Sequence, residues 1–204
     1  MQFRFRMTSA GRIAAFSAIL CSVLLVPSLV PTALAQRYSD PDTLAPAYPS
    51  PQVVVERMLK LADVKPGEMV YDLGCGDGRI VITAAMKFGA KAVGVEIRRD
   101  IYETTLARVA SLGLSEKVQI VHGDALKTNL APADVVTLYL LTSSNERLRP
   151  VLEAQLKPGA RVISHDFEIR GWKPAQMEKM IIEGRPHMIY SYVMGTERPD
   201  SRHK

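Results

Sequence analysis

Three glycines alternate with larger residues in the segment Asp72-Leu73-Gly74-Cys75-Gly76-Asp77-Gly78, which begins with an acid. The mainly apolar residues 69–73 before it are typical of a short strand, and a helical pattern follows over 79–88. Glycine permits positive φ angles and lets a ligand approach the backbone closely. An acid at the carboxyl end of a strand lies where open α/β sheets bind their ligands. The segment therefore predicts a small-molecule site at a strand–helix turn.

Three kinds of ligand site use a glycine-rich turn of this sort. A dinucleotide fold needs G-x-G-x-x-G, but the spacing here is G-x-G-x-G and the Asp72 carboxylate would repel a pyrophosphate. A P-loop needs Lys and Ser or Thr after its last glycine, whereas Arg79-Ile80 follow here. An acid in this place can instead accept a hydrogen bond from an ammonium group. The segment resembles the motif of class I S-adenosylmethionine-dependent methyltransferases, although a tight turn without a ligand would also contain glycines.

Two further acids follow strand-like runs. Glu96 ends the run 92–96, 24 residues after Asp72, and Asp124 follows the run 118–121 and Gly123. In the family that the glycine motif resembles, these acids accept hydrogen bonds from the ribose hydroxyls and from the adenine amine. Each acid alone could be a solvated strand end or a turn residue. Their order along the chain, each after a predicted strand, favours S-adenosylmethionine as the cofactor.

Hydrophobic periodicity defines the elements that carry these groups. Helices are predicted over 51–63, 79–88, 100–112 and 145–156, and strands over 69–73, 92–96, 118–121, 135–141, 161–165, 176–182 and 187–194. Apolar strands that alternate with helices are typical of a largely parallel sheet covered on both faces. Only Glu183-Gly184-Arg185-Pro186 separate the last two strands, so one of them is expected to be antiparallel. Together with the resemblance, this predicts an α/β fold of the Rossmann-like class I methyltransferase type, with a largely parallel seven-stranded sheet and a C-terminal antiparallel hairpin.

A closer resemblance extends over about residues 48–195. The segments that carry it are Tyr48-Pro49-x-Pro51, Tyr71-Asp72-Leu73-Gly74-Cys75-Gly76-Asp77-Gly78-Arg79-Ile80-Val81, Leu138-Tyr139-Leu140-Leu141, and Leu156-Lys157-Pro158-Gly159-x-Arg161-Val162-Ile163-Ser164 before Phe167 and Trp172. They are similar to the lysine methyltransferases that modify the c-subunit of ATP synthase, and to their bacterial relatives. The family usually has a proline shortly after the fourth strand, where this chain has Thr142-Ser143-Ser144. The acceptor pocket is expected at that place.

The resemblance implies roles for individual residues. Asp72 would hold the methionine end of the cofactor, Glu96 the ribose and Asp124 the adenine, while Tyr48 would close over the cofactor. The implied cofactor-binding residues are Tyr48, Asp72, Gly74, Cys75, Gly76, Glu96, Asp124 and Ala125, and the acceptor-pocket residues are Tyr139, Leu141, Thr142 and Asp166. Packing and turn roles are the alternatives for Tyr139 and Asp166. We name no general base, and we expect no metal site because neither His122 nor His165 has a second ligand at useful spacing.

Composition and charge limit the classes of partner. With 47% hydrophobic and 23% charged residues, the chain has the composition of an ordinary globular domain. Three of the basic residues that give the net charge of +5 lie in the first 35 residues, which contain no acid. The remainder is nearly neutral, so no nucleic-acid partner is expected. Cys21 and Cys75 are the two cysteines, and removal of the leader would leave no pair for an intrachain disulfide.

The first 35 residues have the pattern of a signal peptide. Arg4, Arg6 and Arg12 precede the apolar run 13–26, and Ala33-Leu34-Ala35 offers small residues for cleavage before Gln36. An uncleaved leader would be a membrane anchor instead. Either alternative places the following domain outside the cytoplasm, in the periplasm or the extracellular space. The expected organisation is a leader over 1–35, a Pro-rich linker over 36–50, a methyltransferase domain over 51–195 and a tail over 196–204.

The predicted activity is methyl transfer from S-adenosylmethionine to a protein lysine or to a small molecule. An exported domain that binds an adenosyl ligand without turnover is the alternative, because S-adenosylmethionine is expected mainly in the cytosol. A leader that holds an active domain beside a membrane-embedded acceptor would reconcile these observations.

Overall fold

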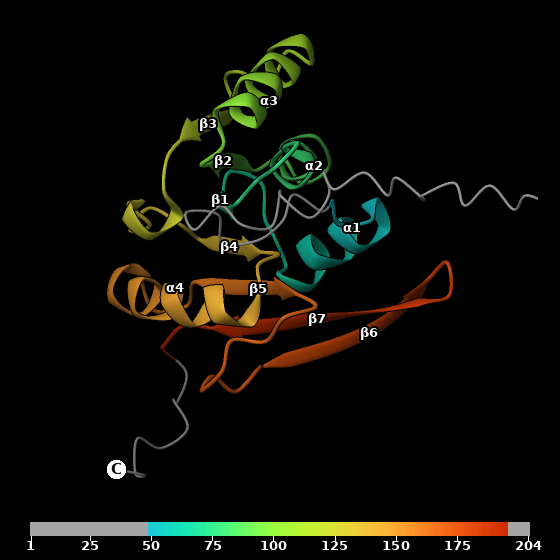
Figure 1. Ribbon diagram of the computed structural model, residues 1–204, viewed down its shortest axis with the longest axis vertical. Coiled ribbons are helices and arrows are strands. Elements are labelled where there is room, and N and C mark those ends of the chain that lie inside the picture. The colour runs from blue at the N-terminus through green and yellow to red at the C-terminus, as the bar shows by residue number, and fades with distance from the viewer. Residues whose placement is uncertain (1–48, 196–204) are drawn as a thin grey trace, which may run out of the picture.

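The computed structural model describes residues 49–195 (Figure 1). Its helices are α1 Gln52–Leu61, α2 Arg79–Phe88, α3 Arg99–Ser111 and α4 Thr142–Gln155, with a short 3-10 helix η3 over Ala125–Lys127. Its strands are β1 Met69–Leu73, β2 Lys91–Glu96, β3 Val118–His122, β4 Val135–Leu138, β5 Arg161–His165, β6 Gln176–Ile182 and β7 Arg185–Val193. The predicted leader, Tyr48, most of the linker and the tail lie outside the described residues.

The seven strands form one sheet in the order β3-β2-β1-β4-β5-β7-β6. Strands β1 to β5 pair in parallel, and β7 runs antiparallel to both β5 and β6. The predicted largely parallel seven-stranded sheet with a C-terminal hairpin is therefore confirmed. Because β1, β2 and β3 are adjacent and parallel, the residues at their carboxyl ends meet at one edge of the sheet.

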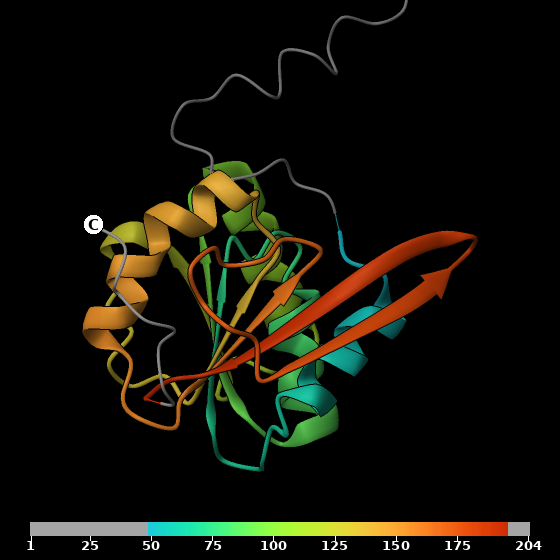
Figure 2. The ribbon, with the colours of Figure 1, turned by 90° about the horizontal axis from the view of Figure 1, so that it is seen from below.

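Helices cover both faces of the sheet (Figures 1 and 2). One face packs against α1, α2 and α3 through a cluster that includes Met58, Val81 and Val109. The other face packs against α4 and η3 through a cluster that includes Leu148, Leu152 and Ala125. The continuous apolar character of the strands follows from this two-sided burial.

The boundary between β4 and α4 differs from the prediction. The strand ends at Leu138 instead of 141, and the helix begins at Thr142 instead of 145. Leu140 is buried although it lies in the connection, and its side chain packs beneath Gly74. An apolar residue here thus fills the space under the glycine turn and does not extend the strand.

The β6–β7 hairpin projects beyond the rest of the sheet (Figure 2). Glu183 and Gly184 at its turn have φ angles of 49° and 77°, as a two-residue turn of the I′ type requires. The Arg57 guanidinium of α1 donates to Glu178 of β6, with Nε 2.6 Å from Oε1. The hairpin is thereby fixed against α1 as well as against β5. None of the helices within residues 49–195 is long and apolar enough to cross a membrane.

Gly94 allows β2 to pass close to the glycine turn, and its replacement tests that packing. A Cβ at this position would lie 2.7 Å from Sγ of Cys75 and 3.1 Å from Cδ1 of Ile120. We expect Gly94→Ala to lower the free energy of unfolding by about 1–3 kcal/mol, the usual effect of overpacking. Chemical denaturation measures the change. Gly123→Ala is the control, because its Cβ would meet its nearest neighbour at 3.7 Å and neither glycine has a positive φ. Equal stability of the two variants would contradict the expectation.

Candidate cofactor and acceptor site

Asp72 is a buried acid at the carboxyl end of β1. Its side chain is 3% exposed, and the Thr137 hydroxyl donates a hydrogen bond to Oδ1 over 2.7 Å. Burial raises the pKa of Asp72 to about 7; the Thr137 bond lowers it, and the charges of Glu96 and Asp77 raise it further. A buried carboxylate surrounded by other acids is stabilised by a cation. This position therefore suits the ammonium group of a ligand.

Glu96 holds the glycine turn in place. Its Oε2 accepts a hydrogen bond from the Gly76 N–H over 3.0 Å, and its Oε1 accepts one from the Arg98 N–H over 2.9 Å. The residue is 6% exposed, so the alternative of a solvated strand-end acid is wrong. Carboxylate oxygens have further lone pairs, and these can accept hydrogen bonds from a diol.

The N–H groups of the glycine turn are hydrogen-bonded within the protein. Those of Gly74 and Cys75 donate to the Val95 carbonyl over 2.9 and 3.0 Å, and that of Gly76 donates to Glu96. Sites for phosphate present such N–H groups to the ligand instead. This turn, lined by Asp72, Asp77 and Glu96, is therefore unsuited to a pyrophosphate.

Asp124 caps η3 at the same edge of the sheet. Its Oδ1 accepts a hydrogen bond from the Leu126 N–H over 2.9 Å, and its Oδ2 lies 3.8 Å from Nζ of Lys127. The Gly123 N–H donates to the Glu96 carbonyl, so this loop is joined to the end of β2, and the neighbouring Ala125 is buried. The turn role is thus present, and the adenine contact stays a prediction.

Cys75 is a buried thiol inside the turn. Burial, followed by the charges of Asp72 and Glu96, raises the pKa of this thiol. The thiol therefore stays protonated at neutral pH and is a poor nucleophile.

The predicted acceptor residues fall into two groups. Tyr139 and Asp166 both adjoin the buried His165 at the end of β5: the Tyr139 and His165 rings stack with centroids 4.1 Å apart, and Asp166 Oδ2 lies 3.3 Å from His165 Nε2. Thr142 begins α4, and the exposed Leu141 precedes it. Asp166 is also a turn residue, with a φ of 60° and an Oδ1 that accepts from the Met188 N–H.

Comparisons with known proteins identify the family. Residues 72–176 match the model of the ANTKMT methyltransferase domain. The chain belongs to this methyltransferase family. An archaeal protein-lysine N-methyltransferase from Saccharolobus islandicus is 47% identical over 75% of this chain and 96% of its own length. The lysine N-methyltransferase of the mouse that is named for the ATP synthase c-subunit is 32% identical over 75% of this chain and 60% of its own length. The predicted resemblance is thereby confirmed.

A solved relative supports the cofactor of this family member. An RNA methyltransferase from Salinibacter ruber in complex with S-adenosyl-L-homocysteine has a TM-score of 0.71 and 41% identity, covering 77% of this chain and all of that one. The residues at the edge fit such a cofactor: Asp72 is a buried acid suited to a cation, and the space above Gly76 is open, with no atom within 4 Å of where a Cβ would stand. The protein is an S-adenosylmethionine-dependent methyltransferase.

The sequence did not indicate how Arg79 connects the turn to the start of the domain. Its guanidinium pairs with Asp77 through Nε and Oδ1 at 2.9 Å, and its NH1 donates to the Ser50 carbonyl over 2.7 Å. The only signal was an arginine placed directly after the last glycine. The predicted linker, which was assigned to 36–50, therefore has its last residue fixed in the methyltransferase domain.

His165 was expected to lack a second ligand nearby, and this was wrong. The hairpin places His187 Nδ1 3.0 Å from His165 Nε2. Burial lowers the pKa of His165 to about 4, against the effect of Asp166, so this imidazole is uncharged at neutral pH. Trp172, in contrast, donates to Glu153 and packs edge-on against Tyr192, which makes it part of the packing around α4.

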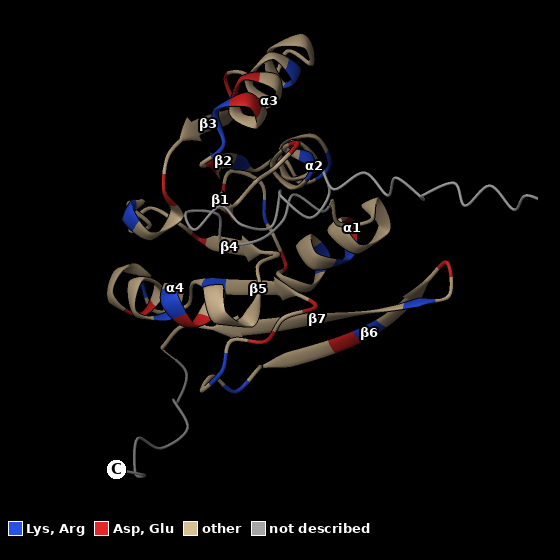
Figure 3. Cartoon of the chain, in the orientation of Figure 1, with Lys and Arg blue, Asp and Glu red and all other residues tan. Residues whose placement is uncertain are grey.

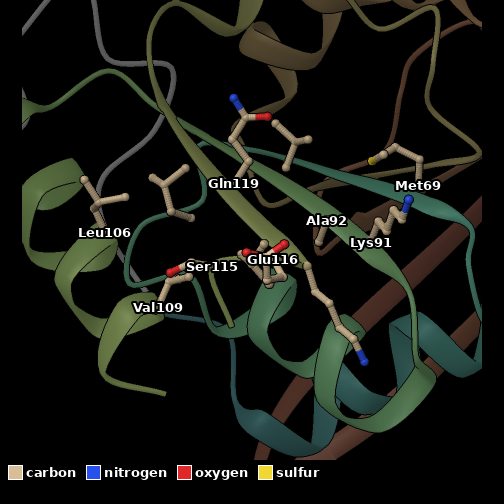
Figure 4. Close-up of a pocket in the computed structure, with 12 residues that line it drawn as sticks. Met69, Lys91, Ala92, Leu106, Val109, Ser115, Glu116 and Gln119 are labelled. Atoms are coloured by element: carbon tan, nitrogen blue, oxygen red, sulfur yellow. The ribbon is translucent and has the colours of Figure 1, made fainter. Parts of the chain in front are cut away.

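A separate hollow of about 380 Å³ lies at the opposite edge of the sheet (Figure 4). Its lining includes Met69 and Lys91, the first residues of β1 and β2, and Leu106 of α3. The acids that fit the cofactor lie at the other ends of the same strands. The hollow is therefore distinct from the methyltransferase site.

Proposed function

We propose that the protein transfers the methyl group of S-adenosylmethionine to the ε-amino group of a lysine in a protein acceptor. The observation that carries the proposal is the 47% identity to an archaeal protein-lysine N-methyltransferase, of which this chain covers 96%. The acids at the ends of β1 and β2 supply the cofactor site that such an enzyme needs. The chain covers 60% of the mouse c-subunit methyltransferase, so that enzyme's own substrate is not transferred to this protein.

In this proposal the chain acts by binding and alignment. Asp72, held by Thr137, binds the ammonium of the cofactor, and Glu96 binds the ribose while it holds the glycine turn. The cofactor supplies an electrophilic methyl group, so no covalent intermediate with the protein is needed. Correct placement of the two reactants can contribute on the order of 7–11 kcal/mol to catalysis.

The acceptor amine must be uncharged when it attacks, and the aromatic side chains beside the site favour that state. Tyr139 lies between His165 and Phe167, with centroid distances of 4.1 and 6.0 Å. Loss of water against such a surface lowers the pKa of an amine. The acceptor lysine is therefore placed near Tyr139 in this proposal.

RNA is the second candidate acceptor, because the solved relative with 41% identity is named an RNA methyltransferase. Charge favours protein. Acidic and basic segments alternate over the described elements (Figure 3), and 23 basic residues face 21 acidic ones over 36–204. RNA-binding surfaces usually show a concentrated basic patch.

Methyl-labelled S-adenosylmethionine, offered with a lysine-rich protein and with RNA, tests the proposal. Mass spectrometry should find the label on lysine side chains, with release of S-adenosyl-L-homocysteine. Label only in RNA would overturn the acceptor class. Cofactor binding without transfer to any acceptor would favour the alternative of an exported domain that binds without turnover.

We infer that the domain is exported or anchored at a membrane, on the basis of the leader pattern in residues 1–35. The native protein is expected to begin at Gln36, because Ala33 and Ala35 supply the small residues that cleavage needs. N-terminal sequencing of protein from its native host checks this. A chain that still begins at Met1 would argue for an anchor, and one that begins near Arg12 for a different start site.

A further inference from the structure

Three side-chain atoms with lone pairs converge at the carboxyl end of β5. His165 Nε2 and His187 Nδ1 are 3.0 Å apart, and each lies 3.3 Å from Asp166 Oδ2. The atoms thus form a nearly equilateral triangle. A hydrogen-bonded chain would need two short contacts and not a third, because one hydrogen lies between one pair of atoms.

The size of the triangle matches the requirement of a tetrahedral metal ion. Zinc holds nitrogen and oxygen ligands at about 2.0–2.2 Å, which separates neighbouring ligand atoms by roughly 3.3–3.5 Å. Two of the three separations fall at the lower end of this range, and the third is shorter by a few tenths of an ångström. A small shift of one imidazole ring would admit the ion.

The remaining polar atoms of two of these side chains already have partners. His165 Nδ1 lies 2.8 Å from the Ser50 hydroxyl, so an N–H at Nδ1 can donate to it and leave the lone pair on Nε2. Asp166 Oδ1 accepts from the Met188 N–H over 2.8 Å, which leaves Oδ2 for the ion. Hydrogen bonds of this kind orient the ligands in metal sites.

Partial exposure allows an ion to reach the triangle. The His187 and Asp166 side chains are 13% and 25% exposed, whereas His165 is fully buried. Three protein ligands leave one tetrahedral position for water or another ligand. Imidazole and carboxylate together suit zinc and its neighbours among the first-row metals better than magnesium.

We propose that His165, Asp166 and His187 bind one divalent transition-metal ion, with Zn²⁺ as the reference ion. The site joins the end of β5 to the hairpin and, through Ser50, to the start of the described chain. The ion would therefore hold together segments that are far apart in sequence. The proposal does not depend on the acceptor of the methyl group.

Isothermal titration of tag-free, chelator-treated protein with ZnCl₂ tests the site. We expect one equivalent to bind to the wild type, with a rise in its thermal midpoint, and no comparable effect of MgCl₂. Asp166→Asn should weaken Zn²⁺ binding at least tenfold; asparagine also tolerates the positive φ of 60° and can accept from the Met188 N–H. His187→Ala should weaken it at least 100-fold.

Two histidine variants outside the triangle are matched controls. His122 is exposed on β3 and His203 lies outside the described residues, and replacement of either with alanine should leave Zn²⁺ affinity unchanged. Cobalt absorption provides a second measurement, since a tetrahedral Co²⁺ spectrum should appear in the wild type and disappear in Asp166→Asn. Circular dichroism verifies that each variant is folded. A wild type that binds no Zn²⁺, or an Asp166→Asn variant that binds it as well as the wild type does, would overturn the proposal.

Discussion

Replacement of Asp72 with asparagine is expected to weaken S-adenosylmethionine binding at least tenfold. Hydrogen bonds to charged groups contribute about 1.5–3 kcal/mol, and asparagine keeps the shape of the side chain while it removes the charge. Isothermal titration of the wild type and the variant measures the difference. Neither form should bind NAD, because the N–H groups of the glycine turn already have acceptors within the protein.

The same substitution should have the opposite effect on the stability of the cofactor-free protein as pH rises. The folded-state pKa of Asp72 is raised from 3.8 to about 7. Between these values the unfolded chain has released its proton while the folded protein still holds it, so stability falls as pH rises through this window. At about 1.4 kcal/mol per pKa unit the loss is on the order of 4 kcal/mol by pH 7. The variant lacks this loss, so its melting temperature relative to the wild type should increase between pH 4 and pH 8.

Cofactor binding to the wild type should accordingly strengthen as pH rises toward 7 and Asp72 becomes ionised, while the Asp72→Asn variant should lack this dependence. Asp63→Asn is a suitable control, because Asp63 is an exposed acid in the turn after α1 and its φ of 50° is one that asparagine tolerates. Wild-type affinity for the sulfonium cofactor in Asp72→Asn, or NAD binding by the wild type, would remove the main physical argument for the cofactor site.

Replacement of Glu96 with alanine is expected to affect both binding and folding. The change removes the acceptor for the Gly76 and Arg98 N–H groups, and a buried unsatisfied donor costs about 1–3 kcal/mol. We therefore expect the free energy of unfolding to fall by about 2 kcal/mol or more, and cofactor affinity to fall with it. Denaturant unfolding and titration of the same preparation measure the two effects.

Glu96→Gln separates these contributions. Glutamine keeps the volume and one acceptor oxygen, so it should destabilise the fold less than alanine does while it still weakens binding. Glu116→Ala, at an exposed glutamate before β3, should change neither property. Unchanged stability in Glu96→Ala would mean that the turn is held by the Val95 carbonyl alone.

Local pattern was sufficient to predict most of the fold. The bounds of β1, α2, β5 and β6 agree with the prediction, because each has a distinct apolar period and a glycine or proline nearby. The end of β4 was misjudged, because Tyr139-Leu140-Leu141 continues the apolar run although Leu140 packs under Gly74. A run of apolar residues reports burial, and burial also occurs outside strands.

The site was predictable only in part. Asp72, Glu96 and Asp124 were found because each follows a strand and parallel strands end at one edge. The double contact of Glu96 was missed, because no sequence pattern shows which backbone N–H a carboxylate accepts from. The Ser50–His165 and His165–His187 contacts join residues 115 and 22 positions apart, and only the packing of the hairpin beside β5 produces them.

The described chain begins and ends at opposite edges of the sheet. Ser50, near its start, contacts Arg79 and His165 at the carboxyl edge, whereas Val193 in β7 pairs with Arg161 at the amino end of β5. A fluorophore or surface linkage attached just ahead of Ser50 would therefore stand at the entrance that the cofactor and acceptor use. Attachment after Gly195 leaves that entrance clear, so immobilisation for binding measurements belongs at the C-terminal end.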